Sequence, residues 1–260
     1  MSRLQGKIAL ITGAASGMGE AVVRRFRHEG AEVFAVGLQP EHLASLAVQT
    51  GAVATHCDVT DDASVRNTVA ALKARFGRLD IVVNCAGVIR ADDAADIDDA
   101  TWHRTLDVNL TGAMRICRAA LTLMQQQRSG VIVNVGSVAA FNGSPGMASY
   151  AASKAGLVAL TRTIAHRYGP EGVRANYLAP GWVRTPMSEN EMQQIAEAQN
   201  TSVESAFAAA AGRTALQRVG TVEEMAACVL FLASDESAFV TGAVLVADGG
   251  ARIPATARAV

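Results

Sequence analysis

The chain has 260 residues, 50% of them hydrophobic and 18% charged, so it can bury a large core and is too apolar to be disordered. Its 23 basic and 24 acidic residues give a net charge of -1, and no cluster of Lys or Arg could neutralise several phosphates, which argues against nucleic acid as a partner. No apolar run approaches the roughly 18 residues of a membrane helix and no signal segment is recognisable, so we expect no membrane partner and a cytoplasmic location.

Short apolar runs rich in β-branched residues alternate along the chain with longer segments of helical periodicity, which is typical of a parallel sheet with helices on both faces. The expected strands are Ile8–Ile11, Val33–Val36, Val53–Cys57, Ile81–Val83, Val131–Val135, Arg174–Leu178 and Val244–Val246. The expected helices are Gly17–Glu29, Asp61–Phe76, Thr101–Gln126, Tyr150–Tyr168 and Val222–Leu232. We therefore predict an α/β fold, a Rossmann-type doubly wound parallel sheet of about seven strands.

No linker divides the chain, and we expect residues 1–260 to form a single domain. Residues 184–220 fit the alternation poorly, because Thr185-Pro186 opens a polar, alanine-rich insertion. An insertion of this length is usually functional or mobile. The tail 251–260 has little periodicity, and we expect it either to fray or to pack on another subunit.

The cysteines are spaced singly, without a C-x-x-C pair. They are Cys57, Cys85, Cys117 and Cys228. We therefore expect small core residues here, with no disulfide framework and no metal.

The first expected strand is followed by the turn Thr12-Gly13-Ala14-Ala15-Ser16-Gly17-Met18-Gly19 and then directly by a helix. A strand, a glycine turn and a helix start bring unpaired backbone N–H groups and the positive end of the helix dipole to one point, which suits a pyrophosphate. A tight turn that only packs the helix closely on the strand is the alternative. On the first interpretation, the dinucleotide contacts are Gly13, Ser16, Gly17, Met18 and Gly19.

The end of the second expected strand bears on the choice of nucleotide. It reads Val36-Gly37-Leu38-Gln39, without the acid that usually binds an adenosine ribose and without the Arg that a 2′-phosphate favours. A neutral site at Leu38 and Gln39 accepts a hydroxyl more readily than an unmatched dianion, so NAD is favoured over NADP. A more distant cation such as Arg24 would reverse this choice.

Tyr150 and Lys154 are four residues apart in an expected helix and therefore lie on one face of it. An ammonium about 5 Å from a phenol, at an effective dielectric near 20, favours the phenolate by about 3 kcal/mol and lowers the tyrosine pKa by about two units. Tyr150 would then serve as a general acid or base. The alternative is an ordinary pair on a surface helix.

Together these motifs resemble the short-chain dehydrogenase/reductase family, and the resemblance spans nearly the whole chain. It rests on the glycine turn, Asn84-Cys85-Ala86-Gly87, Asn109, Ser137, Tyr150 with Lys154, and Pro180-Gly181, which follow the family's order and approximate spacing. The resemblance implies that Ser137 holds the substrate oxygen and that Tyr150 exchanges its proton. Asn109 would anchor a water that links Lys154 to solvent. The run Val135-Gly136-Ser137 lacks the two serines of many members, so only Ser137 can fill this role.

The same resemblance implies a nicotinamide dinucleotide cofactor and gives roles to residues that follow the strands. These residues are Asp58 and Val59 at the adenine, Asn84, Ala86 and Gly87 at its ribose, and Pro180, Gly181, Val183 and Thr185 at the nicotinamide and its phosphate, with Tyr150 and Lys154 also in reach. Asn84 and Asn109 have structural alternatives, as helix caps or bridges between strands. Asp58 has one as an acid at a helix N-terminus.

Ligands of open parallel sheets bind beyond the carboxyl ends of the strands, so residues after the fourth, fifth and sixth strands are expected to wall the substrate site. The candidates are Arg90, Ser137, Ala139, Phe141, Met147, Trp182 and Met187. Arg90 either meets an anionic substrate or is simply solvated. Met192 and Phe207, on the insertion, either close over the ligand or pack in a core.

The activity that the resemblance implies is an NAD(P)-dependent interconversion of a secondary alcohol and a ketone, with a small molecule as partner. Two alternatives stay open: nucleotide binding without redox turnover, and a lyase or epimerase on the same scaffold. No residue selects among secondary alcohols, polyols, sugars, hydroxysteroids and 3-oxoacyl thioesters.

The helix expected at Tyr150–Tyr168 carries more apolar residues than one sheet face requires, since Leu157, Leu160, Ile164 and nearby alanines spread around it. A helix of a second subunit would cover the remainder. The resemblance implies a homotetramer built through this helix and its predecessor, with the strand near Val244 at a second interface.

Overall fold

Residues 2–143 and 146–251 are described by the computed structural model, and within them seven parallel strands form one sheet. The strand order is β3-β2-β1-β4-β5-β6-β7, so the chain winds outward from the centre in both directions. The strands are β1 (Ile8–Thr12), β2 (Glu32–Gly37), β3 (Val53–His56), β4 (Ile81–Asn84), β5 (Gly130–Val135), β6 (Val173–Pro180) and β7 (Val244–Ala247). This is the Rossmann-type order. It confirms the predicted fold class, and the strand bounds lie close to those expected.

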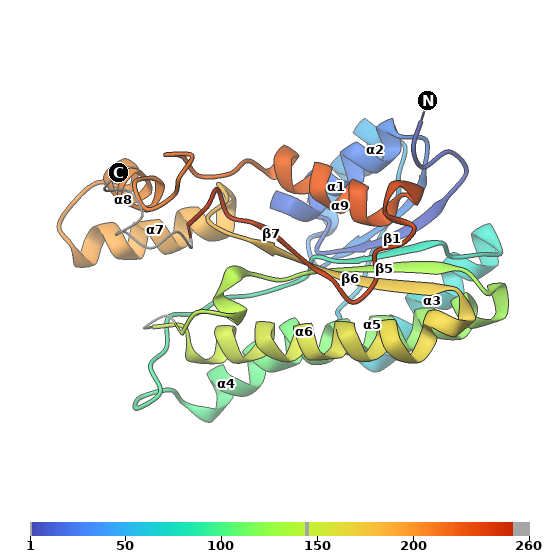
Figure 1. The fold of residues 1–260 in the computed structure, drawn as a ribbon, viewed down its shortest axis with the longest axis horizontal. Coiled ribbons are helices and arrows are strands. Elements are labelled where there is room, and N and C mark those ends of the chain that lie inside the picture. Colours follow the sequence, from blue (N-terminus) through green and yellow to red (C-terminus); the bar gives the residue numbers. More distant parts are fainter. Residues whose placement is uncertain (1, 144–145, 252–260) are drawn as a thin grey trace.

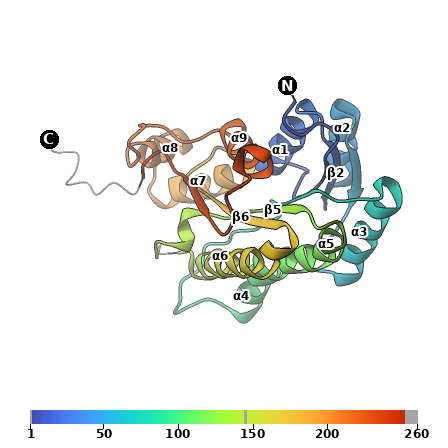
Figure 2. The same cartoon turned by 45° about the vertical axis from the view of Figure 1, so that its right-hand side comes forward.

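Helices cover both faces of the sheet (Figure 1, Figure 2). One face carries α1 (Gly17–His28), α2 (Pro40–Thr50) and α9 (Val222–Ala233), and the other carries α3 (Asp62–Phe76), α5 (Ala113–Gln127) and α6 (Ala148–Tyr168), with α4 (Asp99–Leu106) packed on α6. The sequence pattern does not predict α2, because this helix buries little beyond Leu43 and Leu46. No helix within the described ranges is long and apolar enough to span a membrane.

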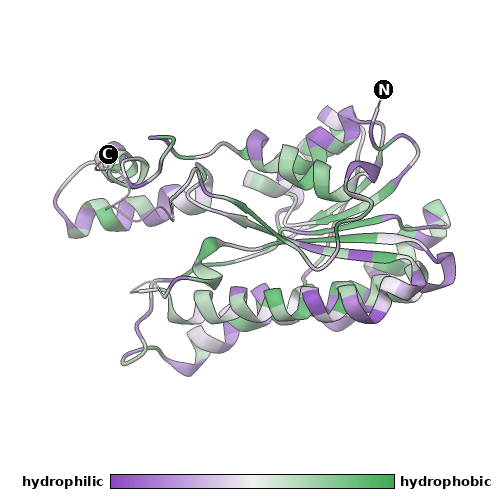
Figure 3. Ribbon diagram, viewed as in Figure 1, coloured by the Kyte–Doolittle hydropathy of each residue, from purple (hydrophilic) through white to green (hydrophobic). Residues whose placement is uncertain are grey.

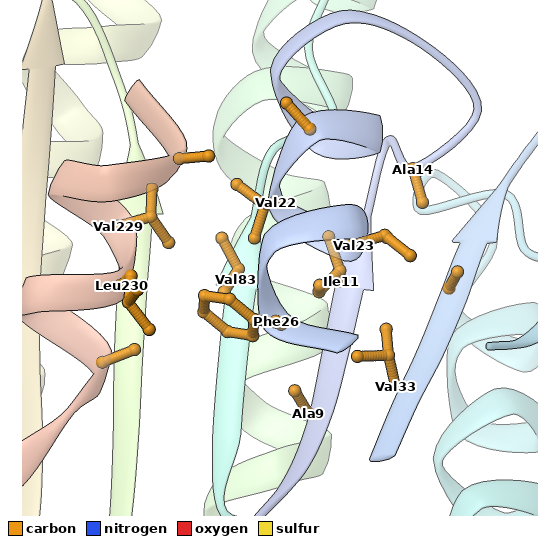
Figure 4. Close-up of a cluster of buried hydrophobic side chains, with 14 of the residues drawn as sticks. Ala9, Ile11, Ala14, Val22, Val23, Phe26, Val33, Val83, Val229 and Leu230 are labelled. Atoms are coloured by element: carbon orange, nitrogen blue, oxygen red, sulfur yellow. The ribbon is translucent and has the colours of Figure 1, made fainter. Parts of the chain in front are cut away.

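The core between α1, α9 and the sheet is built from aliphatic side chains around one aromatic ring (Figure 4). Phe26 of α1 is fully buried in the same cluster as Ile11, Val83 and Leu230. The strands are apolar along most of their length (Figure 3), as expected for strands covered on both faces. This packing holds the carboxyl ends of the central strands in fixed positions.

The segment 101–126, expected as one helix, contains most of α4, a π-helical turn at Asp107–Gly112 and most of α5. The prediction of a continuous α-helix is therefore wrong at this turn. The turn fits closely against the neighbouring loop, since a Cβ on Gly112 would lie 2.7 Å from the Val59 side chain. Such turns are frequent at functional sites, and this one carries Asn109.

The insertion at 184–220 folds into α7 (Pro186–Ala198) and α8 (Val203–Ala211), which lie together beyond the sheet (Figure 1). Met192 and Phe207 are 1% and 3% exposed in the small core between these two helices, so they pack there and do not close over a ligand. The expectation for the C-terminal tail concerns residues 252–260, which lie outside the described residues.

The apolar surplus expected on α6 is smaller than the sequence indicates. Leu157 and Ile164 are buried in the protein's own core, and Leu160 is half-buried against it. Ala152 and Ala159 are among the small residues on the exposed face. The homotetramer stays a prediction.

Candidate active site

The glycine turn between β1 and α1 requires glycine for two separate reasons. Gly13 has a φ of +63, and a Cβ there would lie 2.7 Å from the backbone nitrogen of Ala86. A Cβ on Gly19 would overlap the carbonyl oxygen of Gly13. Ser16, the N-cap of α1, makes no side-chain capping hydrogen bond, so the N–H groups of the first turn have no side-chain partner. This cradle fits a pyrophosphate.

A groove of about 220 Å³ follows the carboxyl ends of β1 to β4. The expected cofactor residues that line it are Gly13, Ser16, Gly17, Met18, Gly19, Leu38, Gln39, Asp58, Val59, Ala86, Gly87 and Thr185. The phosphate cradle and a polar end suited to adenosine are thus parts of one groove, and the residues fit a dinucleotide. We call it the nucleotide groove.

Arg104 of α4 also lines the nucleotide groove, and the sequence analysis missed it. It lies near Asp58: burial acts to raise the Asp58 pKa, but hydrogen bonds from Thr60 and the charges of Arg104 and His56 outweigh burial and lower it. The sequence does not show that an arginine within a helix lines this groove, because the groove forms only when the chain is folded.

Arg24, the distant cation considered for a 2′-phosphate, does not line the groove. Its guanidinium donates to Glu20 at 2.7 Å and to Gln49 at 2.6 Å. The Arg24 guanidinium is therefore paired with groups outside the groove at Leu38 and Gln39.

Asn84 lies elsewhere than predicted. Its side chain is 3% exposed, and its Nδ2 donates to the Oδ1 of Asn134 at 2.8 Å, across to the neighbouring strand β5. Asn134 in turn donates to the Oγ1 of Thr161 at 2.8 Å, which ties both strands to α6. Asn84 does not line the nucleotide groove, so the structural alternative holds for this residue.

A second hollow of about 170 Å³, which we call the inner cavity, lies at the carboxyl ends of β5 and β6 beside α7. The expected residues that line it are Ser137, Ala139, Met147, Tyr150, Pro180, Gly181, Trp182, Val183, Thr185 and Met187. Met18, Thr185 and Met187 line both the inner cavity and the nucleotide groove, so the two hollows are continuous.

Two expected substrate residues do not line the inner cavity. The Phe141 ring packs edge-on against Tyr177, with ring centroids 6.2 Å apart. Arg90 is exposed and lines neither hollow. The cavity is lined instead by residues that the sequence analysis did not select, among them Val138, Asn142, Ser188 and Glu191.

Tyr150 and Lys154 share one face of α6, as expected, and the Lys154 Nζ lies 5.5 Å from the centroid of the Tyr150 ring. Lys154 is 4% exposed, and its Nζ donates to the carbonyl oxygen of Val135 at 3.3 Å. A Cβ on Gly87 would lie 3.5 Å from this Nζ. Because Gly87 lines the nucleotide groove, the ammonium lies close both to that groove and to the phenol ring.

The expected fall in the Tyr150 pKa is wrong for this structure. Burial raises the pKa of Tyr150 to about 12, although the Ser137 hydroxyl acts in the opposite direction. Burial also lowers the pKa of Lys154 to about 8. The prediction counted the attraction between the two charges and omitted the cost of removing a phenolate from water. At neutral pH, Tyr150 keeps its proton and most Lys154 is an ammonium.

Ser137 follows β5 and is held by Tyr177 of β6, a residue that the sequence analysis missed. The Tyr177 hydroxyl accepts from the Ser137 N–H at 2.9 Å and donates toward the carbonyl oxygens of Ser137 at 3.2 Å and Lys154 at 3.3 Å. A Cβ on Gly136 would overlap the Tyr177 ring. The glycine before Ser137 therefore makes room for the tyrosine that positions the serine.

Asn109 is buried in the π-helical turn and holds the segment that follows β4. Its Oδ1 accepts from the Val88 N–H at 2.8 Å, and its Nδ2 donates to the Val88 carbonyl oxygen at 2.9 Å and to the Ser153 Oγ at 3.1 Å. Both Nδ2 hydrogens are thus used, and the side chain acts as a positioning group between this segment and α6. The water expected at Asn109 stays a prediction.

Asp92, which the sequence analysis also missed, holds the start of α6. Its carboxylate accepts from the Ser149 N–H at 3.2 Å and from the Ser149 hydroxyl, while its own N–H donates to the Gly146 carbonyl oxygen at 3.0 Å. The N-cap residue Met147 provides no side-chain cap, so Asp92 replaces it from a distant segment. This fixes the helix directly before Tyr150.

The four cysteines are free thiols. Burial raises the pKa of Cys85 and of Cys117 to about 12, which makes both weak nucleophiles. Over residues 2–143 and 146–251, no three His, Cys, Asp or Glu side chains come together as a metal ion would require.

Known sequences resemble this chain over most of its length. The family described as enoyl-(acyl carrier protein) reductase matches residues 13–252. A 3-oxoacyl-(acyl-carrier-protein) reductase of Thermotoga maritima is 39% identical over 253 residues, which cover 95% of this chain and 98% of that protein.

Solved structures show the same fold at similar identity. A short-chain dehydrogenase/reductase from Burkholderia xenovorans has a TM-score of 0.90 and 37% identity, covering 97% of this chain and 98% of that one. A structure named as a ribose-5-phosphate isomerase from Brucella melitensis 16M has a TM-score of 0.91 and 32% identity, covering 99% of this chain and 97% of that one.

Proposed function

Because the chain belongs to the short-chain dehydrogenase/reductase family, whose members use NAD(P) nucleotides in redox reactions, we propose that it interconverts a secondary alcohol and a ketone. The proposed catalytic set is Ser137, Tyr150 and Lys154 together with Asn109, which positions the others. The proposed partner is a small alcohol or ketone.

One observation carries this proposal. Tyr150 and Ser137 both line the inner cavity, and that cavity opens into the nucleotide groove at Met18 and Thr185. A ketone in the cavity can therefore direct its oxygen at two hydroxyl groups while its carbonyl carbon faces the groove. A phenol and an alcohol at one carbonyl oxygen are suited to polarise it and to protonate it.

When bound, the nucleotide supplies the hydride, and the chain's residues supply the proton and the charge. Ser137 polarises the carbonyl oxygen and Tyr150 donates its phenolic proton. The Tyr150 pKa of about 12 keeps that proton in place through the neutral range. Lys154, with a pKa of about 8, is a neighbouring cation that stabilises the phenolate left behind. This protonation state favours ketone reduction.

We propose NAD in preference to NADP. The side chains of Leu38 and Gln39 leave the groove uncharged where the adenosine ribose is expected. Arg24 is occupied by Glu20 and Gln49, and Arg104 lies near Asp58 on the adenine side. Among the described residues, Arg104 is the only arginine that lines the groove, so none is placed beside Leu38 and Gln39 to bind a 2′-phosphate.

The test is reductase activity, followed through the absorbance of the reduced nicotinamide. A panel of ketones is assayed with NADH and NADPH side by side over a range of pH. We expect turnover of ketones with NADH, a lower kcat/KM with NADPH, and a decline in rate above about pH 8 as Lys154 loses its proton. Absence of turnover with every ketone and both nucleotides would refute the function, and a higher kcat/KM with NADPH would refute the cofactor preference.

We also propose a homotetramer that uses α6 and its predecessor as one interface, and a cytoplasmic location. The exposed alanines of α6, such as Ala152 and Ala159, would permit close approach of a second helix. Light scattering at micromolar concentration tests the assembly. A monomer would contradict it.

A further inference from the structure

Glu191 of α7 is the one charged side chain among the described residues that line the inner cavity. The same residue lines an adjoining hollow between α7 and the segment after β4. Asn190 and Gln194 line this second hollow, and Met147 and Met187 line both. A molecule that extends from Tyr150 toward α7 therefore passes Glu191.

Packing and capping fix the orientation of α7, so the position of Glu191 in the cavity lining is fixed as well. Met187, Glu191 and Gln194 are three and four residues apart and share one face. The opposite face is anchored, because Met192 and Ala196 are buried against α8. A capping box at the start of α7 fixes its first turn.

The carboxyl group of Glu191 has no partner among residues 2–143 and 146–251, where it makes no hydrogen bond or ion pair. The residue is only partly exposed. Glu204 of the neighbouring α8, by contrast, is paired with Arg184 at 2.8 Å. Burial raises the pKa of Glu191 to about 7, and its charge acts on Tyr150. A partly buried carboxyl group in this position lacks hydrogen-bond partners unless a ligand provides a polar group.

The chemistry of the site selects among possible ligand groups. A carboxylate or phosphate on the substrate would face Glu191 with no cation among the lining residues to offset it. An ammonium can pair only with the ionised form of Glu191, whereas a hydroxyl can donate to the carboxylate and accept from the neutral acid. The amide side chains of Asn190 and Gln194, which line the adjoining hollow, are polar and uncharged and can also bind a hydroxyl group.

Resting on the proposed function, we propose that Glu191 is a specificity-determining residue that binds a hydroxyl group of the substrate. The enzyme then prefers hydroxyketones and the corresponding polyols over oxo acids of the same length. The favoured substrate places its hydroxyl beyond the reacting carbonyl, on the side of α7.

The test compares three ketones of similar length: 5-hydroxy-2-pentanone, 2-hexanone and 4-oxopentanoate. We expect kcat/KM of the wild type to favour the hydroxyketone over the oxo acid by roughly tenfold or more. Glu191→Gln keeps a polar group but removes the charge, so this ratio should fall by about tenfold. Glu191→Leu should remove the advantage of the hydroxyketone over 2-hexanone. Glu189→Gln is the matched control, because Glu189 is an exposed acid on the same helix, and it should leave every ratio unchanged.

The outcomes separate this inference from the proposed function. If the wild type reduces none of the ketones and binds none of them in calorimetric titrations with the nucleotide present, both proposals fail. If the ketones are reduced or bound but the ratio of hydroxyketone to oxo acid is the same in wild type and Glu191→Gln, this inference alone fails. A preference for aminoacetone over hydroxyacetone would overturn the assignment of a hydroxyl. Glu191→Gln is first shown to bind NADH as the wild type does, so that a folding defect is not taken for a change in specificity.

Discussion

Replacing Lys154 by Met is predicted to give a protein that is more stable and inactive. Lys154 is 4% exposed, and within the described residues its Nζ has one hydrogen bond, to the Val135 carbonyl oxygen at 3.3 Å. Burial lowers its pKa from 10.5 to about 8. That difference corresponds to roughly 3 kcal/mol by which burying the cation opposes folding.

The effect of Lys154→Met on the free energy of unfolding should depend on pH. Above pH 10.5 the lysine is neutral in both the folded and the unfolded chain, and the cost is absent. As the pH falls from 10.5 to about 8, the unfolded chain takes up the proton first and the folded state loses stability relative to it. Below about pH 8 the cost is complete. Lys154→Met should therefore be more stable than the wild type at pH 7, by up to roughly 3 kcal/mol, with little difference near pH 10.5.

Urea unfolding followed by circular dichroism, at pH 7 and near pH 10.5 and at one protein concentration, measures this difference. Lys73→Met is the matched control, because Lys73 is exposed on α3 and should show no such gain. Loss of stability in Lys154→Met at pH 7, or a gain of equal size at both pH values, would refute the reasoning that burial dominates at this lysine.

Three further predictions follow from contacts around the site. Tyr177→Phe removes the hydroxyl that holds Ser137, and we expect kcat to fall roughly 10- to 100-fold with an unchanged Kd for NADH; an unchanged kcat would count against a positioning role. Gly19→Ala places a Cβ on the Gly13 carbonyl oxygen and should weaken NADH binding in fluorescence titrations, whereas Gly169→Ala, where a Cβ meets nothing within 4 Å, should not. Glu191→Gln should raise the free energy of unfolding at pH 8 by about 1 kcal/mol after solvent screening, and should not raise it at pH 4.5. Burial raises the pKa of this carboxyl to about 7, so its ionisation destabilises the folded state as the pH rises. Equal effects of this substitution at both pH values would contradict that cause.

The parts of the fold that the sequence predicts are those whose signal is local. The strands are short, nearly continuous apolar runs, because both faces of the sheet are covered, and all seven were expected. The helices of the insertion lack such a signal. In α7 the buried residues are Ser188, Met192 and Ala196, so packing on α8 produces no strong apolar stripe. The π-helical turn at Asp107–Gly112 also cannot be predicted from the sequence, because one extra residue per turn does not change the amino-acid composition that is typical of a helix.

The candidate site divides in the same way. Tyr150 and Lys154 are one helical turn apart, so their common face follows from spacing alone. Tyr177 and Asp92 act on residues far along the chain, and their roles appear only when β6 and the segment after β4 are in place. Asn84 stands at the very end of its strand, where the sequence does not show whether the side chain faces the groove or the adjoining strand. The sign of the Tyr150 pKa shift depends on burial, which the sequence does not give.

The most direct test concerns the proton that Tyr150 donates to a substrate in the inner cavity, next to the nucleotide groove. Tyr150→Phe keeps the ring and removes the hydroxyl, and Tyr168→Phe makes the same change at the far end of α6. We predict that ketone reduction by Tyr150→Phe falls roughly 100- to 10,000-fold while its Kd for NADH stays that of the wild type, and that Tyr168→Phe retains full activity. Turnover by Tyr150→Phe at a rate comparable to the wild type would contradict the account.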